Sequence, residues 1–512
     1  MKYVLIFHAN LNYAYLNPDK YEFVIRNSYE LTFDTMAENF PNTKYVFEAS
    51  GYTIEQMALL TPDVLEKLKK AIANGTCEFM GSPYAHPMLP NFPQEDGTWA
   101  IKFSNDIFKK YLGITPKSFW NPECGWRSYV PQQVIDNGFK NLIGDFESYS
   151  RSCYKDGTPV RPEIYEQEHS DEVAFYSFGF KYDLEGSERA IHFPINKIEG
   201  YEENAVRMFL RTDRICQFGV RHFMGMEGYS FEDYMALIKK YSQQKPGEPE
   251  GALVIFADDA EYIGTNGWFR LKYQNKPDNV FEKTPDSKEK LIRLVTEVEK
   301  LGEFITYDEA CNLQPLEETV NIDDDIAWHG GRASTWASTP MAKILRPWQD
   351  LVREKLHEIK NTLDDATIEK VWYHLTNSYN SDGQWPPTLP DAPHIIYPFN
   401  YQYCFENLLA AELLVGGVDR NRLASSPLDT MKEILTIQQD LILEKADLLL
   451  ASGTEEEKEN AQHAKVLIEK SRNIDSIALS SDKILYPAEY TIRANMLIEA
   501  RRLVGGVTLE KN

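Results

Sequence analysis

The chain of 512 residues is 43% hydrophobic and 12% aromatic, enough to bury a sizeable core in one large domain with a smaller one, or in two to three domains. Its 78 acidic and 54 basic residues give a net charge of −24 without a basic stripe, which argues against a protein that binds DNA or RNA. We therefore expect a neutral or small-molecule partner.

The six cysteines lie far apart and form no C-x-x-C pair, so neither a disulfide framework nor a thiolate zinc site is expected. Reduced thiols are typical of a reducing compartment. The first apolar run, YVLIF, is too short for a signal-peptide core, and no other stretch approaches the length of a membrane span. These features predict a soluble, cytoplasmic protein.

The first 310 residues alternate short apolar runs with helical patterns, as in strand-helix-strand crossovers of a parallel sheet. A helix is predicted at 61–75, with Thr61 as N-cap, Pro62 in the first turn and Gly75 as its stop. Further helices at 230–241 and 287–302 each begin at a serine. The predicted strands are 2–7, 44–49, 77–82, 118–120, 140–145, 190–195 and 252–257, with 303–307 as a candidate eighth.

Seven or eight such strands predict an α/β fold with an incomplete TIM-like (β/α)7 barrel over residues 1–310. Residues 311–339 are interpreted as a linker and cleft-lining segment. From residue 340 to 512 the patterns are helical almost throughout, which predicts a C-terminal α-helical bundle.

Polar and acidic side chains follow the predicted strands, where a barrel of this type carries its active site. Carboxylates beside tryptophans suit a site that cleaves sugars, because aromatic faces stack on sugar rings and glycosidic cleavage needs two acids. The residues concerned include His8, Glu48, His86, Glu123, Asp145, Glu147, Asp258, Asp259 and Glu261.

Each of these residues also has a purely structural interpretation. A single glutamate at a strand end, such as Glu123, more often forms a salt bridge or caps a loop. His8 and His86 would serve equally as core histidines, and no histidine spacing suggests zinc. Asp258 and Asp259 would cap a turn or bind a divalent cation, but DDAEYIG lacks the spacing of a calcium loop. No metal and no cofactor are expected.

The segment FWNPECGW, residues 119–126, resembles the third signature region of glycoside hydrolase family 57, a group active on glucans. The resemblance implies that Glu123 is the catalytic nucleophile, between Trp120 and Trp126 at the substrate. ADDAEYIG, residues 257–264, resembles the fourth region, which implies that Asp259 is the general acid/base, with Asp258 and Glu261 beside it.

Three further segments resemble family signatures in the same order. EFMGSPYAHPMLP places His86 at the substrate, His8 matches the histidine of the first region, and AWHGGRAS contributes Trp328 and His329 to the cleft. NSDGQWPPTLPD suggests substrate contacts at Asp382 and Trp385. The first region departs from the usual His-Gln-Pro, since it reads His8-Ala9-Asn10, and the fourth has Ala260 where glycine or threonine is usual.

The resemblance implies a retaining hydrolase of α-1,4-glucans such as starch, glycogen and maltooligosaccharides, similar to an α-amylase, with an α-glucan as its partner. A 4-α-glucanotransferase or an α-galactosidase of the same family is the alternative, as is a non-catalytic glucan-binding protein suggested by the altered first region. A metal-dependent deacetylase or α-mannosidase would need a histidine and aspartate cluster that the sequence does not suggest. The sequence predicts no particular oligomeric state.

Overall fold

The computed structural model describes residues 1–13, 16, 18–165, 184, 186, 188–266, 282–384, 398–480, 496–497, 499–501 and 503–505. The chain forms two compact units. The first comprises Met1–Leu11, Glu22–Asn266 and Lys283–Thr335, and the second comprises Asn12–Tyr21, Gly267–Glu282 and Trp336–Asn512. No helix in the described ranges is both long and apolar enough to cross a membrane.

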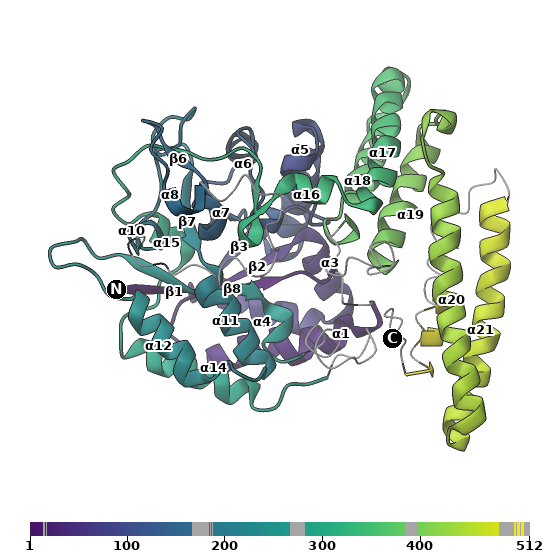
Figure 1. Cartoon of the computed structure of the whole chain (residues 1–512), viewed down its shortest axis with the longest axis horizontal. Helices are drawn as coiled ribbons and strands as arrows, with labels where there is room; N and C mark the ends of the chain where they lie inside the picture. The colour runs from purple at the N-terminus through teal and green to yellow at the C-terminus, as the bar shows by residue number, and fades with distance from the viewer. Residues whose placement is uncertain are drawn as a thin grey trace. The chain divides into compact units, whose positions relative to one another are not determined.

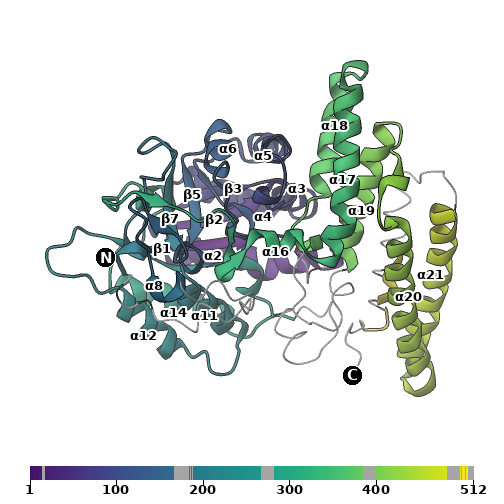
Figure 2. The ribbon, with the colours of Figure 1, turned by 45° about the horizontal axis from the view of Figure 1, so that its top comes forward.

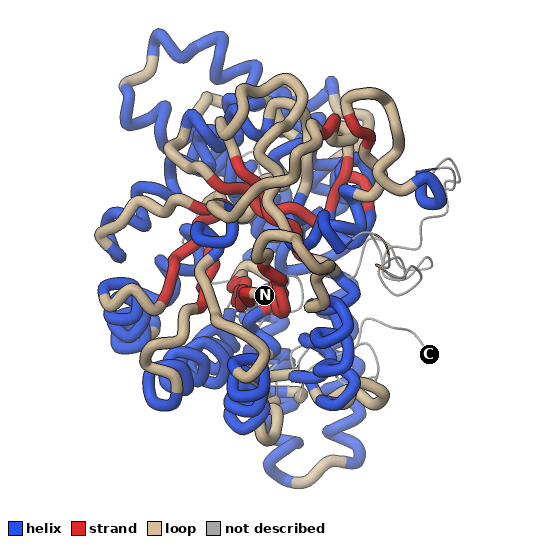
Figure 3. The backbone as a smooth tube through the Cα atoms, turned by 90° about the vertical axis from the view of Figure 1, so that its left-hand side faces the viewer, coloured by secondary structure: helices blue, strands red, loops and turns tan. Residues whose placement is uncertain are grey.

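The first unit is built on a seven-stranded parallel sheet in the order β7-β5-β4-β3-β2-β1-β8. The sheet curves into a nearly closed barrel with helices around it (Figures 1 and 3), which confirms the expected incomplete (β/α)7 architecture. Its strands are β1 (Lys2–Ala9), β2 (Tyr45–Ser50), β3 (Cys77–Ser82), β4 (Ser118–Phe119), β5 (Asn141–Asp145), β7 (Arg207–Arg211) and β8 (Ala252–Asp259).

The helices of this unit follow the amphipathic patterns of the sequence. Ser230 caps α12 by accepting a hydrogen bond from the Asp233 backbone N–H, whereas the Thr61 side chain does not cap α4. The longer helices are α2 (Leu31–Asn39), α3 (Gly51–Leu60), α4 (Pro62–Ala73), α5 (Gln94–Ile107), α6 (Val130–Asp136), α11 (Asp213–Met224), α12 (Phe231–Tyr241) and α14 (Ser287–Glu299), and the short ones used below are α7 (Phe146–Tyr149), α10 (Glu188–His192) and α15 (Tyr307–Cys311).

The strand predicted at 190–195 is wrong. Residues 188–192 form α10, and Ile195 makes a single antiparallel bridge with Met208 of β7. A short apolar run fits a buried helix as well as a strand, and Pro194 has no N–H to give to a sheet. The true strand, β7, was missed because its apolar core is only three residues long and an arginine stands at each end.

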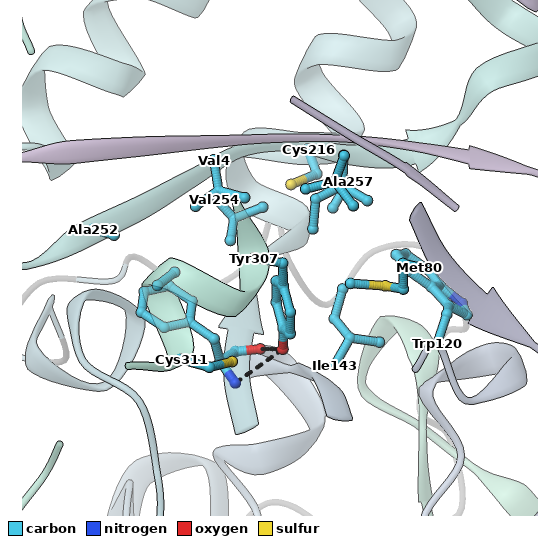
Figure 4. Packing of buried hydrophobic residues seen from close by; sticks show 14 of the residues in the cluster. Val4, Met80, Trp120, Ile143, Cys216, Ala252, Val254, Ala257, Tyr307 and Cys311 are labelled. Carbon is cyan, nitrogen blue, oxygen red and sulfur yellow. Dashed lines mark hydrogen bonds between the residues drawn. The ribbon is translucent and has the colours of Figure 1, made fainter. Parts of the chain in front are cut away.

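The candidate strand at 303–307 is also wrong. Phe304 makes one isolated bridge to Tyr3, and α15 begins at Tyr307. Tyr307 is buried in the core of the barrel, where its hydroxyl accepts a hydrogen bond from Phe209 N at 3.0 Å (Figure 4). The same hydroxyl lies 2.8 Å from the carbonyl oxygen of Phe209 and 2.9 Å from that of Leu142. This hydroxyl therefore adds a side-chain contact to two strands that are already paired in the sheet.

The second unit is helical throughout its described residues. Its long helices are α17 (Pro340–Ile359), α18 (Asp365–Asn377), α19 (Pro398–Leu414), α20 (Pro427–Ser452) and α21 (Glu455–Ser480), of which α20 and α21 lie side by side (Figure 2). The buried Glu412 of α19 accepts hydrogen bonds from Trp348 Nε1 of α17 and from Arg420 Nε. One buried carboxylate with satisfied hydrogen bonds thus links α19 to α17.

Replacing Tyr307 with phenylalanine should lower the free energy of unfolding by about 1–3 kcal/mol, because the Phe209 N–H would lose its partner in a dry core. Urea unfolding measures this change. The matched variant Tyr201→Phe removes a partly exposed hydroxyl that donates to Ser128 O, and should cost less than about 0.5 kcal/mol. Equal losses in the two variants would contradict a stabilising role for the buried Tyr307 hydroxyl.

Candidate active site

The polar residues at the ends of the barrel strands face inward, as do the apolar core residues two positions before them. Side chains two residues apart on a strand share a face, so the polar residue that comes two positions after the last apolar core residue also points into the barrel. The pairs are Ile6 and His8, Val46 and Glu48, Met80 and Ser82, Ile143 and Asp145, and Phe209 and Arg211. Apolar side chains thus fill the interior of the barrel, and polar side chains line the C-terminal ends of its strands, which form the mouth of the barrel.

A β-bulge places Asp259 on the same inner face. Val4 pairs with Val254 but Leu5 pairs with Phe256, so β8 contains one extra residue at this point. Such an insertion reverses the alternation of side chains beyond it. Ala257 consequently joins the inner core, and Asp259, two residues further on, is in register with His8 of β1.

His8 lies at the centre of the mouth. Its ring stacks on Trp120, with centroids 4.4 Å apart and an interplanar angle of 13°, and lies 5.3 Å from the ring of His86 and 6.0 Å from that of Trp328. Its Nδ1 pairs with a carboxylate oxygen of the buried Glu48. Burial alone would lower the pKa of His8, but Glu48, with Asp259 and Glu261, outweighs it and raises this pKa to about 9.

Glu123 reaches the same mouth from the turn after β4. It has a left-handed backbone with φ of 56°, is 5% exposed, and its Oε1 lies 3.7 Å from Nδ1 of His86. His86 is also left-handed, with φ of 55°. Burial, together with the charge of His8, lowers the pKa of His86 well below its usual range. Left-handed backbone at residues other than glycine is strained and is typical of functional sites.

Glu261 ties the first and fourth sequence regions together. Its Oε1 accepts hydrogen bonds from the hydroxyl of Tyr29 and, at 2.8 Å, from the backbone N–H of Asn10. A proline at position 10, as in the usual His-Gln-Pro, would have no N–H to donate. Burial raises the pKa of Glu261 to about 7. The altered first region therefore makes a contact of its own with the segment that carries Asp259.

Arg211, at the end of β7, forms the second polar group of the mouth. Its side chain is fully buried, and its guanidinium bonds Asp145 at 2.9 Å, Asp258 at 3.2 Å and Asp213. Neither Arg211 nor Asp213 is among the predicted site residues, because β7 and the start of α11 that follows it are absent from the predicted elements. The pattern RMFLRTD, an apolar triplet before a Thr-Asp helix start, was the available signal.

Trp328 and His329 stand beside this group on the hairpin of β10 (Ile326–Ala327) and β11 (Gly331–Arg332). The ring of Trp328 lies 4.8 Å from the Arg211 guanidinium and 5.4 Å from the ring of Trp120. His329 Nδ1 lies 2.8 Å from Asp213 Oδ2. Trp126 is buried as well, and its backbone N–H donates to Ile326 O at 2.8 Å. The fifth region thus meets the third and fourth regions at the mouth.

Carboxylate oxygens of Asp145, Glu147 and Asp213 come within 4.8 Å of one another, a spacing that would suit a metal ion. These oxygens already accept hydrogen bonds. Glu147 accepts from the Thr212 hydroxyl at 2.6 Å and from Asp213 N at 3.0 Å, while Arg211 bonds the two aspartates. Asp145 and Asp213 therefore act as acceptors for the arginine, while Glu147 accepts from the start of α11.

Two further residues were predicted to contact the substrate. Asp382 belongs to the second unit, where it is buried at the start of the turn η9 (Asp382–Gln384). Trp385 lies outside the described residues.

A family model described as glycosyl hydrolase family 57 matches residues 2–323. An enzyme named alpha-amylase 1, from Dictyoglomus thermophilum, is 27% identical over 128 residues, which cover 24% of this chain and 19% of that protein. A 4-alpha-glucanotransferase from Thermococcus litoralis is 27% identical over 113 residues, covering 22% and 17%. The chain thus matches about a fifth of the length of these relatives.

Among solved structures, a family 57 branching enzyme from Thermococcus kodakaraensis, in complex with glucose, has a TM-score of 0.55 at 13% identity. The similarity covers 85% of this chain and 93% of the branching enzyme. At this identity the likeness shows a shared fold.

The buried pair of His8 and Glu48 should make stability depend on pH. Because folding raises the pKa of His8 from 6.5 to about 9, the stabilisation is complete below about pH 6.5 and is lost as the pH rises through about 9. Glu48→Gln should cost about 3–5 kcal/mol at pH 6.5 and clearly less near pH 10. Urea unfolding at the two pH values measures both costs.

The control for this measurement is Glu66→Gln, which alters an exposed carboxylate that pairs with Lys69 on α4. Its effect should be small at both pH values. A cost of Glu48→Gln that stays constant from pH 6.5 to pH 10 would contradict a charged His8.

Proposed function

Because the chain belongs to glycosyl hydrolase family 57, we propose that it acts on α-1,4-linked glucans by a retaining mechanism, with Glu123 as nucleophile and Asp259 as general acid/base. The observation that carries this proposal is the convergence of two carboxylates on one mouth. Asp259 is in register with His8 on the neighbouring strand, His8 packs against His86, and His86 lies 3.7 Å from Glu123.

In the first step, a carboxylate oxygen of Glu123 bonds to the anomeric carbon while the glycosidic C–O bond breaks. Asp259 gives its proton to the departing oxygen. In the second step, Asp259 takes a proton from the acceptor, which is water or a sugar hydroxyl. The oxygen of that acceptor bonds to the anomeric carbon while the bond from this carbon to Glu123 breaks. Retention by this route requires the two carboxyl groups to lie about 5 to 5.5 Å apart.

Aromatic and amide groups of the mouth support a sugar as the substrate. The indole N–H groups of Trp120 and Trp328 and the side-chain amide of Asn121 are buried and have no hydrogen-bond partner among the residues described. Buried donors of this kind are normally satisfied, and sugar hydroxyls would satisfy them while the ring packs on an indole face. His8, His86, Trp126, Glu261 and His329 are the other proposed contacts of the substrate.

A 4-α-glucanotransferase is the second candidate, favoured by the similarity to the enzyme of that name from Thermococcus litoralis. The two activities share the first step and differ in the acceptor, which is water in one case and a glucan hydroxyl in the other. We further propose a cytoplasmic location, which the six free cysteines support.

Glu123→Gln should lower turnover of maltoheptaose by at least about 10⁴-fold, since an amide cannot form the covalent intermediate. The urea midpoint should stay close to that of the unmodified protein. The matched variant Glu227→Gln changes an exposed residue after α11 and should keep full activity. Activity of Glu123→Gln near that of the control would refute the assignment of the nucleophile.

Incubation with maltoheptaose followed by mass spectrometry separates the two candidate activities. Products that are all shorter than the substrate would identify a hydrolase, the result we expect. Products both shorter and longer would identify a glucanotransferase. An unchanged substrate would contradict both and favour a glucan-binding protein or another glycoside as the substrate.

A further inference from the structure

Arg211 is connected to both segments that flank the mouth on the side of β8. Its Nη2 bonds Oδ2 of Asp258 at 3.2 Å, while Oδ1 of Asp258 accepts the backbone N–H of Asp259 at 3.0 Å. Gln217 Nε2 holds Asp258 from α11 at 2.8 Å. The carboxylate of Asp258 is thus engaged on both oxygens, and it fixes the peptide from which the Asp259 side chain extends.

The same guanidinium supports the hairpin that carries Trp328 and His329. Asp213, bonded to Arg211 Nη1, holds Nδ1 of His329 at 2.8 Å. Asp145, bonded to the same nitrogen at 2.9 Å, accepts the backbone N–H of Gly330 at 3.4 Å. His329 has a left-handed backbone with φ of 61°, a conformation that persists only where its surroundings hold it.

These contacts matter because the sheet itself does not fix β8 against β7. The two strands are the ends of the seven-strand order and do not pair. The backbone N–H and carbonyl oxygen of Met208 in β7 bond to the backbone of Ile195. At the mouth, the ion pair of Arg211 with Asp258 is a direct side-chain link between the two strands.

We propose that Arg211 is a positioning residue for catalysis, which holds the Asp258–Asp259 turn and the Trp328–His329 hairpin in the geometry that proton transfer by Asp259 requires. This inference rests on the proposed function of Asp259. It assigns to Asp258 a role in orienting its neighbour. A lysine cannot replace the arginine, because a single ammonium does not span carboxylates on both sides as the planar guanidinium does.

The test compares Arg211→Lys, which keeps the buried charge, with Arg221→Lys as a matched control. Arg221 is a buried arginine of α11 that donates to the hydroxyl of Tyr229. Two substrates are used, maltoheptaose and α-maltosyl fluoride. Fluoride leaves without needing a proton, so release of the first equivalent of fluoride depends on Glu123 and not on acid catalysis by Asp259.

Arg211→Lys should lower kcat for maltoheptaose by about 100-fold with little change in KM, and should slow the first turnover of the fluoride by less than about tenfold. Arg221→Lys should change neither rate substantially. A merely structural role for Arg211 would reduce the active fraction and lower both rates by the same factor, a result that would overturn the proposal.

Hydrogen exchange of the full chain gives a second measurement that does not depend on activity. Arg211→Lys should speed exchange in peptides covering 256–264 and 326–332, and leave peptides from β2 and β3 unchanged. If the unmodified protein acts on neither substrate, the proposed function fails. Hydrogen exchange alone then tests whether Arg211 holds the two segments in place. Unchanged exchange in both segments would then overturn the positioning role.

Discussion

One fully buried guanidinium, that of Arg211, is shared by carboxylates from β5, from the start of α11 and from β8. Removing such a charge from water costs several kcal/mol, and this cost is offset only where partners satisfy it with good geometry. Around Arg211 the partners are three aspartates, with the ring of Trp328 on one face. Arg211 holds these acids in a fixed arrangement where β7 and β8, the two end strands of the sheet, do not pair. The geometry of the mouth depends on this constraint.

Electrostatics divide the mouth into two halves. On the β1 side, Glu48 keeps His8 charged, and the pKa of His8 is about 9. Around Arg211, burial raises the pKa of Asp258 on β8 although the guanidinium opposes this effect. Asp259 extends from the strand end between these halves, in register with His8 and directly after Asp258. Environments that shift the pKa values of neighbouring titratable groups apart are typical of sites that move protons.

The sequence was sufficient to predict most of the barrel, because strands buried on both faces read as continuous apolar runs. It also indicated the residues at the strand ends, since His8, Glu123 and Asp259 follow such runs within three positions. It could not reveal β7, where arginines flank three apolar residues, nor the bulge in β8 that turns Asp259 inward. The network of Arg211 was missed for the same reason, because contacts between distant strand ends follow only from the correct strand order.

The separate roles of Asp258 and Asp259 were equally beyond the sequence. The sequence does not distinguish two adjacent aspartates, but in the structure their contacts differ. Asp258 is engaged by Arg211 and Gln217, while Asp259 follows Ala257 on the inner face.

The measurement that tests the central claim most directly is to trap the covalent intermediate with 5-fluoro-α-glucosyl fluoride and locate the label by mass spectrometry of a protease digest. The account predicts that the protein gains one fluoroglucosyl group and that the peptide containing Glu123 carries it. A label on another carboxylate, or turnover of the reagent with inversion at the anomeric carbon, would contradict a retaining mechanism through Glu123.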